Sequence, residues 1–358
     1  MLKSREVLRS RKRIPSVDVF RSIAILSVVF YHFHGFLPYG YFGVDLFFVI
    51  SGLLVGGILI KQFKGSKGIN FWKFIFQRGF KIWPSYYWFL IFGTLVAILC
   101  YRNIEPDYII NPNLKDISRY IFFYQNYTGG PDHRPFDVVW SLCIEEHFYV
   151  LLPVALIITA KIFSNKLRYL LLTVCSLILA GIVFKFLSLW LTHSKDTYMG
   201  THSKLDALGW GVLLAVFVNY YDSYLKDQQW LKILFPIGVL LFSVGLYLFA
   251  NWDNFYFKKV GFYSLSPFCF FLMILGLYHH DFSKWKPFRF VAYYSYNWYL
   301  WHRIFLLIIS RYFGASFLGF VVYLIVSFGT AMLFTIFIEE KFLSIRERVI
   351  NRMFKSSR

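Results

Sequence analysis

The stretch from residue 18 to residue 60 decides the fold of this chain: DVFRSIAILSVVFYHFHGFLPYGYFGVDLFFVISGLLVGGILI. It contains two long apolar runs, joined by a short turn that carries Pro38 and Gly40. Each run is close to the roughly 20 residues that an α-helix needs to cross a bilayer. The stretch therefore predicts a pair of membrane-spanning helices.

Three ionisable residues interrupt these two runs. Arg21 opens the first run, His32 lies in its outer half, and Asp45 lies early in the second run. Ionisable groups inside such runs are costly and are kept where they face a protein interior, a partner or water. Arg21 and His32 are separated by about three helical turns, so both are expected on one helix face, roughly 16 Å apart.

Two interpretations of Arg21 and His32 are open at this point. A cation at one end of a helix and a titratable base at the other suggest a site for an elongated anionic ligand. Alternatively, Arg21 reaches lipid phosphates and His32 is a hydrogen-bonded residue of the helix bundle.

Length and composition predict an all-α, polytopic membrane protein. The chain has 358 residues, of which 22% are aromatic, and its mean hydropathy is +0.52. Only helix bundles and closed barrels satisfy their backbone hydrogen bonds in lipid, and the apolar segments here have helical length. The net charge of +19 comes from Lys and Arg in loops and tails, which is typical of membrane orientation, so we expect no nucleic-acid partner. No cleavable signal peptide is predicted.

The apolar segments predict about ten transmembrane helices. They cover residues 17–36, 42–61, 82–101, 142–162, 168–191, 205–221, 231–250, 259–279, 288–310 and 315–338. Basic residues place the loop 61–81, the tail 1–16 and the tail 339–358 in the cytoplasm. The loop 102–139 has mixed charge and is expected outside. The transmembrane domain is therefore expected to span 17–338.

The inner loop 61–81 is expected to hold an interfacial amphipathic segment that runs into the third helix. Arg78 and Lys81 are three residues apart and share a helix face, with Pro84 near the start of the next element. They could hold phosphates from the inside or serve as positive-inside anchors, and composition alone favours anchors.

A second polar island, VVWSLCIEEHFYVLLP, covers residues 138–153. Ser141 and Glu145 are one helical turn apart, and Glu146 and His147 follow on neighbouring faces. Repulsion between adjacent carboxylates favours keeping a proton on one of them, which suits a general base or a proton partner for His32. The alternative is a water-filled vestibule in which the acids pair with Arg134 or Lys204.

Two later helices carry further polar residues. Lys204 and Asp206 lie at the outer start of the sixth helix, where Gly209 and Gly211 would permit close helix contact. Glycines 52, 56 and 57 are expected to serve packing in the same way. The ninth helix carries Tyr296 and His302, and His302 is expected at mid-membrane depth, facing the bundle with a partner.

These motifs, in this order, resemble the acyltransferase family 3 membrane proteins, which O-acylate carbohydrates and related acceptors of the bacterial envelope. The family's Arg and His separated by ten residues are met by Arg21 and His32. The other matches are the GVDLFFVISG-type run at residues 43–52, the R-x-x-R-x-x-P stretch at Arg78, Lys81 and Pro84, the WSLSVEEQFY-type motif at 140–149, the RxDxLxxG-like segment at 204–211, the SYxxYLxH motif at 295–302, and the IExP-like ending at Ile338 and Glu339.

The chain departs from the family pattern at a few positions. Lys81 and Lys204 stand where Arg is usual, and Lys cannot make the bidentate phosphate or carboxylate contacts of Arg. Cys143 replaces a usual Ser, His147 replaces Gln, and Lys341 stands where Pro is common.

The resemblance implies an integral-membrane O-acyltransferase of the bacterial cytoplasmic (inner) membrane. Its donor would be cytoplasmic acyl-CoA, with acetyl-CoA as the expected co-substrate, and its acceptor a hydroxyl of an envelope carbohydrate or glycolipid. No permanently bound cofactor and no metal are expected. Direct transfer and an acyl-enzyme intermediate both remain open, as does the oligomeric state. A transporter or flippase for an anionic envelope precursor is the alternative function.

The charge pattern adds a mechanism to this expectation. His32 and Glu145 are the expected catalytic pair, in which Glu145 supports His32 as a general base. Arg21, Arg78 and Lys81 are expected to bind the anionic part of the donor. The expected supporting or acceptor-binding residues are Asp45, Ser141, Glu146, Lys204, Asp206, Tyr296 and His302.

Overall fold

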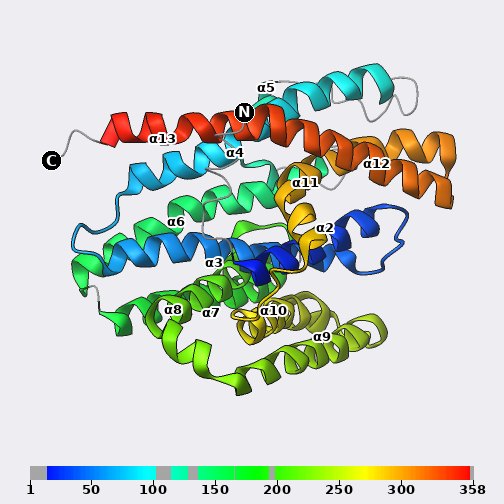
Figure 1. The fold of residues 1–358 in the computed structure, drawn as a ribbon. Coiled ribbons are helices and arrows are strands. Elements are labelled where there is room, and N and C mark those ends of the chain that lie inside the picture. Colours follow the sequence, from blue (N-terminus) through cyan, green and yellow to red (C-terminus); the bar gives the residue numbers. More distant parts are fainter. Residues whose placement is uncertain (1–13, 102–113, 128–135, 165, 193–197, 355–358) are drawn as a thin grey trace.

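The computed structural model describes residues 14–101, 114–127, 136–164, 166–192 and 198–354. These residues form a bundle of helices, and no β-strand occurs among them (Figure 1). The all-α fold predicted from the sequence is confirmed. Most of the tail 1–16, much of the loop 102–139 with Arg134, and the last four residues lie outside the described residues.

Within the described residues, seven helices are long and apolar enough to cross a membrane. They are α3 (Gly43–Lys64), α4 (Phe71–Val96), α6 (Trp140–Ile162), α7 (Leu167–Thr192), α9 (Leu234–Asn251), α10 (Tyr263–Leu277) and α12 (Phe317–Phe334), several of them extended by adjoining helical turns. These helices confirm a polytopic membrane bundle.

Three further helices coincide with the remaining predicted spans. They are α2 (Pro15–His32), α8 (Leu205–Asp227) and α11 (Lys286–Phe313). They are more polar than the other seven, and each packs against other helices of the bundle: α8 lies on α3 and α7, α2 lies on α3 and α11, and α11 also lies on α12. These three helices, which carry ionisable side chains, therefore have protein neighbours, as the cost of charge in lipid requires.

The contacts between α2 and α11 show that these two helices run parallel. The Ser22 hydroxyl on α2 donates to the Phe288 carbonyl, and His32, ten residues further on, contacts His302. In the predicted order these are the first and ninth crossings, which must run in the same direction. The cytoplasmic placement of both termini stays a prediction.

Glycines allow α3 and α8 to pack backbone against backbone. A Cβ on Gly211 would lie 2.0 Å from the carbonyl oxygen of Val49, and one on Gly52 would lie 2.1 Å from that of Leu208. Nothing larger than hydrogen fits at either position, which confirms the predicted packing role of Gly52 and Gly211.

The segment before the third predicted span differs from expectation. Residues 71–96 form one continuous helix, α4, which contains Pro84 in its interior. Asn70 begins the helix, because its side-chain oxygen accepts a hydrogen bond from the backbone N–H of Lys73 at 3.0 Å. The expected interfacial segment is therefore the first part of α4 itself, and Pro84 lies inside this helix rather than near the start of a new element.

The C-terminal segment also has more structure than the expected tail. A π-helical turn (Thr335–Glu339) joins α12 to α13 (Glu340–Phe354), and together they form the long orange-to-red rod in the upper part of Figure 1. Leu343 and Ile350 are buried, while most basic side chains of α13 lie on its outer faces. This amphipathic pattern places α13 against α4.

Candidate active site

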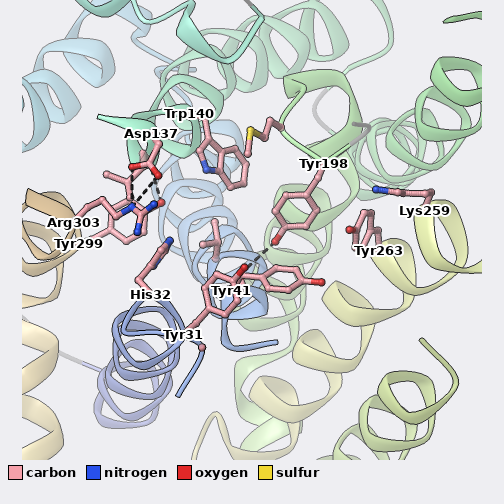
Figure 2. Close-up of a pocket in the computed structure, with 14 residues that line it drawn as sticks. Tyr31, His32, Tyr41, Asp137, Trp140, Tyr198, Lys259, Tyr263, Tyr299 and Arg303 are labelled. Carbon is pink, nitrogen blue, oxygen red and sulfur yellow. Dashed lines mark hydrogen bonds and ion pairs between the residues drawn. The ribbon is translucent and has the colours of Figure 1, made fainter. Parts of the chain in front are cut away.

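A cavity of about 590 Å³ lies at the His32 end of α2 (Figure 2). Its volume falls within the range of ligand-binding clefts. Six aromatic residues from different elements line it: Tyr31, Tyr41, Trp140, Tyr198, Tyr263 and Tyr299. Its ionisable lining residues are His32, Asp137, Lys259 and Arg303. The cavity therefore combines broad apolar walls with a few polar groups.

His32 and His302 form a hydrogen-bonded pair at the wall of the cavity. Nδ1 of His302 lies 2.8 Å from the Tyr299 carbonyl oxygen, and its Nε2 lies 3.1 Å from Nδ1 of His32. His302 is fully buried, whereas His32 is half-buried and lines the cavity. The sequence predicted that His302 faces the bundle and has a partner. The structure agrees, because His302 is buried and its partner is His32.

The hydrogen-bond partners of the two histidines assign their tautomers. A carbonyl oxygen only accepts, so Nδ1 of His302 carries a hydrogen and its Nε2 holds a lone pair. His32 must then donate from Nδ1, which also lies 2.9 Å from the Val28 carbonyl oxygen. Nε2 of His32 is left with a lone pair, as a general base requires.

Ser141 supports the cavity wall from behind. Its hydroxyl oxygen lies 2.8 Å from the Tyr299 hydroxyl, and both hydroxyls reach the carbonyl oxygen of Val138. Ser141 is thus a buried partner of Tyr299, and Tyr299 itself lines the cavity.

The cavity also contains an ion pair that the sequence did not predict. Nε of Arg303 donates to both carboxylate oxygens of Asp137, at 3.2 and 2.9 Å. Asp137 lies in a short 3-10 turn (Asp137–Val139) that leads into α6, and Arg303 directly follows His302 on α11. The only sequence signal was the position of each residue beside a polar motif.

Asp45 and Lys204 form a buried pair behind the cavity wall. Nζ of Lys204 donates to Oδ1 of Asp45 at 2.6 Å and lies 3.3 Å from the ring centroid of Tyr198. The Tyr198 hydroxyl is 3.4 Å from Oδ2 of Asp45, and burial raises the pKa of this tyrosine well above its usual value. Lys204 therefore pairs with Asp45, and not with Glu145 or Glu146 of α6 as the vestibule alternative expected.

Asp206 lies in a different buried pair. Its carboxylate accepts a hydrogen bond from Lys185 on α7, which also donates to the Tyr263 carbonyl at 3.0 Å and the Ser264 hydroxyl at 3.1 Å. Asp206 does not line the cavity. The sequence signal for Lys185 is a single cation within the apolar run of residues 181–190.

Glu145 and Glu146 lie in a second polar cluster, toward the Arg21 end of α2. The Tyr149 hydroxyl donates to Glu145 at 2.6 Å, and Nε1 of Trp83 donates to Glu146 at 3.1 Å. The charges of Arg21 and Arg78 both act on Glu145.

This placement differs from the predicted support of His32 by Glu145. The described hydrogen bonds of His32 go to Val28 and His302. Glu145 lies one turn beyond Ser141 along α6 and is held there by Tyr149, so it faces the arginines.

Arg21 and Arg78 are both half-buried in this second cluster. Nη2 of Arg21 donates to the Ser295 hydroxyl at 3.3 Å, and Nη2 of Arg78 lies 3.5 Å from the Leu54 carbonyl oxygen. Arg78 also lies over the Tyr149 ring, 5.8 Å from its centroid. The two predicted donor-binding arginines thus both lie near enough to Glu145 for their charges to act on it.

Lys81 is engaged by a carboxylate in the π-helical turn that follows α12. It donates to Glu339, whose other oxygen accepts from the Asn297 amide at 2.8 Å. The nearby Tyr296 hydroxyl donates to the Ile82 carbonyl at 2.9 Å and so joins α11 to α4. These contacts favour a structural role for both Lys81 and Tyr296.

Comparison with known proteins gives one family and several relatives. A family model described as an acyltransferase domain matches residues 14–337. The O-acetyltransferase OatA of Staphylococcus aureus is 29% identical over 351 residues, which cover 92% of this chain and 56% of the relative. A putative O-acetyltransferase of the same species is 30% identical, over 82% of this chain and 51% of the relative.

A third relative is the peptidoglycan O-acetyltransferase OatA of Listeria monocytogenes, which is 26% identical over 82% of this chain and 49% of its own length. The chain thus spans about half the length of the curated relatives it matches. No solved structure matches it.

Proposed function

This chain belongs to the acyltransferase family whose model it matches from residue 14 to residue 337, and we propose that it is a membrane O-acetyltransferase. It moves an acetyl group from acetyl-CoA to a hydroxyl of an envelope carbohydrate. The observation that carries this proposal is the His32–His302 pair, which leaves Nε2 of His32 with a lone pair at an aromatic-lined cavity.

The proposed acceptor enters the cavity. Flat aromatic side chains such as Trp140 and Tyr263 present apolar surface on which the C–H face of a sugar ring can pack. The names of the relatives, one of which acts on peptidoglycan, support a carbohydrate acceptor. The apolar spans support a multi-pass location, and we place the protein in the bacterial cytoplasmic membrane.

The proposed donor binds through the second polar cluster. Arg21 and Arg78 can hold phosphate oxygens of coenzyme A by charge-assisted hydrogen bonds. Arg21 and His32 are eleven residues apart on one helix, so an extended pantetheine arm would carry the thioester toward His32. The charge of Glu145 partly balances the two arginines, and the donor phosphates would offset the remaining positive charge.

The transfer step follows from these positions. Nε2 of His32 takes the proton of the acceptor hydroxyl as its oxygen attacks the thioester carbonyl carbon. The tetrahedral intermediate collapses, the C–S bond breaks, and the thiolate receives the proton from His32. The products are the ester and free coenzyme A. In this step the acetyl group passes directly to the acceptor, with His32 acting as base.

Thiol release by the purified protein tests this function. The protein in lipid nanodiscs is given acetyl-CoA with and without a soluble glycan oligomer, and both free thiol and acetylated glycan are measured. We expect the two products to appear in equal amounts, only when the glycan is present, and to be lost in His32→Gln. Movement of a glycolipid across vesicles without thiol release would instead indicate a transporter.

A further inference from the structure

Arg303 presents unused hydrogen-bond donors beside the proposed base. Within the part of the chain that the structure describes, its hydrogen bonds all run from Nε to Asp137. The four N–H bonds of its two Nη atoms are therefore available to a molecule in the cavity that Arg303 lines. Its side chain is 16% exposed, so these donors are largely shielded from bulk solvent.

We propose that Arg303 is a catalytic residue, which stabilises the oxyanion of the transfer reaction, and that Asp137 positions it. The inference rests on the proposed acetyl transfer. As the acceptor oxygen bonds to the carbonyl carbon, the π electrons of the thioester move to the carbonyl oxygen. The Nη–H groups of Arg303 hold this oxygen until the C=O bond re-forms and the C–S bond breaks.

The position of Arg303 relative to His32 supports this role. Figure 2 shows the His32 ring directed toward the side of the cavity where Arg303, Asp137 and Tyr299 lie. The charge of Arg303 acts on both His32 and His302. A thioester carbon within reach of a hydroxyl that His32 activates would have its oxygen close to this guanidinium. Charged donors are worth most where water is excluded and the donors are already oriented.

Three other donors of the cavity are less suited to this task. The Tyr299 hydroxyl is engaged by Ser141 and by the Val138 carbonyl. The Tyr198 hydroxyl lies 3.4 Å from both Asp45 and the Tyr41 carbonyl oxygen. Lys259 is on the opposite side of the cavity from Arg303 in Figure 2. Arg303 is the cation on the same side as His32.

Asp137 explains why an arginine fits here. Both of its carboxylate oxygens accept from Nε, at 3.2 and 2.9 Å, so the pair fixes the plane of the guanidinium from its Nε edge. The Nη edge then faces away from Asp137. A lysine in this position would keep the charge but would lack the planar group that can bind Asp137 and the substrate at once.

Steady-state kinetics of Arg303→Gln, Arg303→Lys and Asp137→Asn test the proposal in nanodiscs. We expect Arg303→Gln to lower kcat by about 100- to 1,000-fold, with KM for acetyl-CoA changed by no more than about threefold. Arg303→Lys should keep part of the activity. Asp137→Asn should lower kcat by about tenfold at unchanged KM, and should have little further effect in the Arg303→Gln background, because it acts through Arg303.

Two controls keep the test interpretable. Arg311→Gln removes the same charge from an exposed position on the same helix and should behave as wild type. The double variant Asp137→Asn with Arg303→Gln leaves no unpaired charge, so it should fold and bind acetyl-CoA by calorimetry while remaining slow.

The outcomes separate this inference from the proposed function. If Arg303→Gln keeps kcat within about threefold of wild type, or only raises KM for the acceptor, Arg303 is not the oxyanion-stabilising residue. If the wild type itself releases no thiol with any glycan, the acetyl-transfer proposal fails first. An inactive His32→Gln beside an active Arg303→Gln overturns the role of Arg303 alone.

Discussion

Nε2 of His302 lies 3.1 Å from Nδ1 of His32, and this contact joins α2 to α11 at the cavity wall. His302 is anchored in turn by the carbonyl oxygens of Trp298 and Tyr299 on its own helix. Together with the Val28 carbonyl, the pair therefore sets the orientation of the His32 ring and the nitrogen that carries its hydrogen.

The first prediction concerns His302 as a positioning residue. His302→Phe removes one of the two acceptors for Nδ1–H of His32 and leaves only the Val28 carbonyl of the same helix, so kcat should fall by about 10- to 100-fold, part of what a general base contributes. His302→Gln offers a carbonyl oxygen to the same hydrogen and should retain more activity. Both should bind acetyl-CoA as wild type does. If the glutamine variant were the slower of the two, the assigned tautomers would be wrong.

The second prediction separates chemistry from binding at His32. His32→Ala and His32→Gln should both lower kcat by on the order of 100-fold or more, because neither side chain accepts a proton at working pH. Calorimetry should show near-normal acetyl-CoA affinity in both. Substantial activity in His32→Gln would make His32 an orienting residue and move the base elsewhere.

The third prediction concerns the donor site. Arg21→Gln and Arg78→Gln should each raise the Kd for acetyl-CoA by about tenfold or more, since each removes charge-assisted hydrogen bonds to phosphate. Lys81→Gln is the matched control, because Lys81 is held by Glu339. It should lower the thermal stability and leave the Kd nearly unchanged. Equal loss of affinity in all three variants would extend the donor site to Lys81.

The fourth prediction compares the two acids of α6. Glu145→Gln removes the charge that faces Arg21 and Arg78, so it should lose most of the transfer activity while the protein still inserts. Glu146 points about 100° away around the helix and accepts from Trp83, so Glu146→Gln should be milder. Thiol release by the two purified variants decides between them, and equal rates would remove Glu145 from the mechanism.

The fifth prediction concerns the contact between α3 and α8. Gly211→Ala would place a methyl group 2.0 Å from a backbone oxygen, so the helices must separate, at a cost of about 1–3 kcal/mol. Gly57→Ala on α3 is the control, because its added methyl group would meet no atom closer than 3.9 Å. Thermal unfolding in detergent should show a lower Tm for Gly211→Ala alone. A similar loss in both variants would contradict the close backbone contact.

The sequence predicted the helices and their polar residues because these depend on local patterns. Apolar runs of spanning length, the glycines at 52 and 211, and the inward orientation of His302 each follow from a few neighbouring residues. The family resemblance identified Arg21, His32 and the acids of α6 as motif residues without any knowledge of their contacts.

The partners of the polar residues could not be predicted in the same way. Asp45 pairs with Lys204, 159 residues away, and Arg303 pairs with Asp137, 166 residues away. Such pairs depend on which helices are neighbours and on how each helix is rotated about its axis. An error of one residue in the assumed register turns a side chain by about 100° around the helix. For the same reason, Glu145 could not be distinguished from His302 as the partner of His32.

The parallel packing of α2 against α11 has a consequence for the synthesis of the protein. The two histidines are 270 residues apart in the chain, and at ribosomal rates of about 5–20 residues per second that interval lasts on the order of tens of seconds. During this time α2 lacks its partner helix. His32 has no contact with His302, and Arg21 has no hydrogen bond to Ser295. Under the proposed function, the nascent chain would therefore be inactive until its ninth helix has packed against the first.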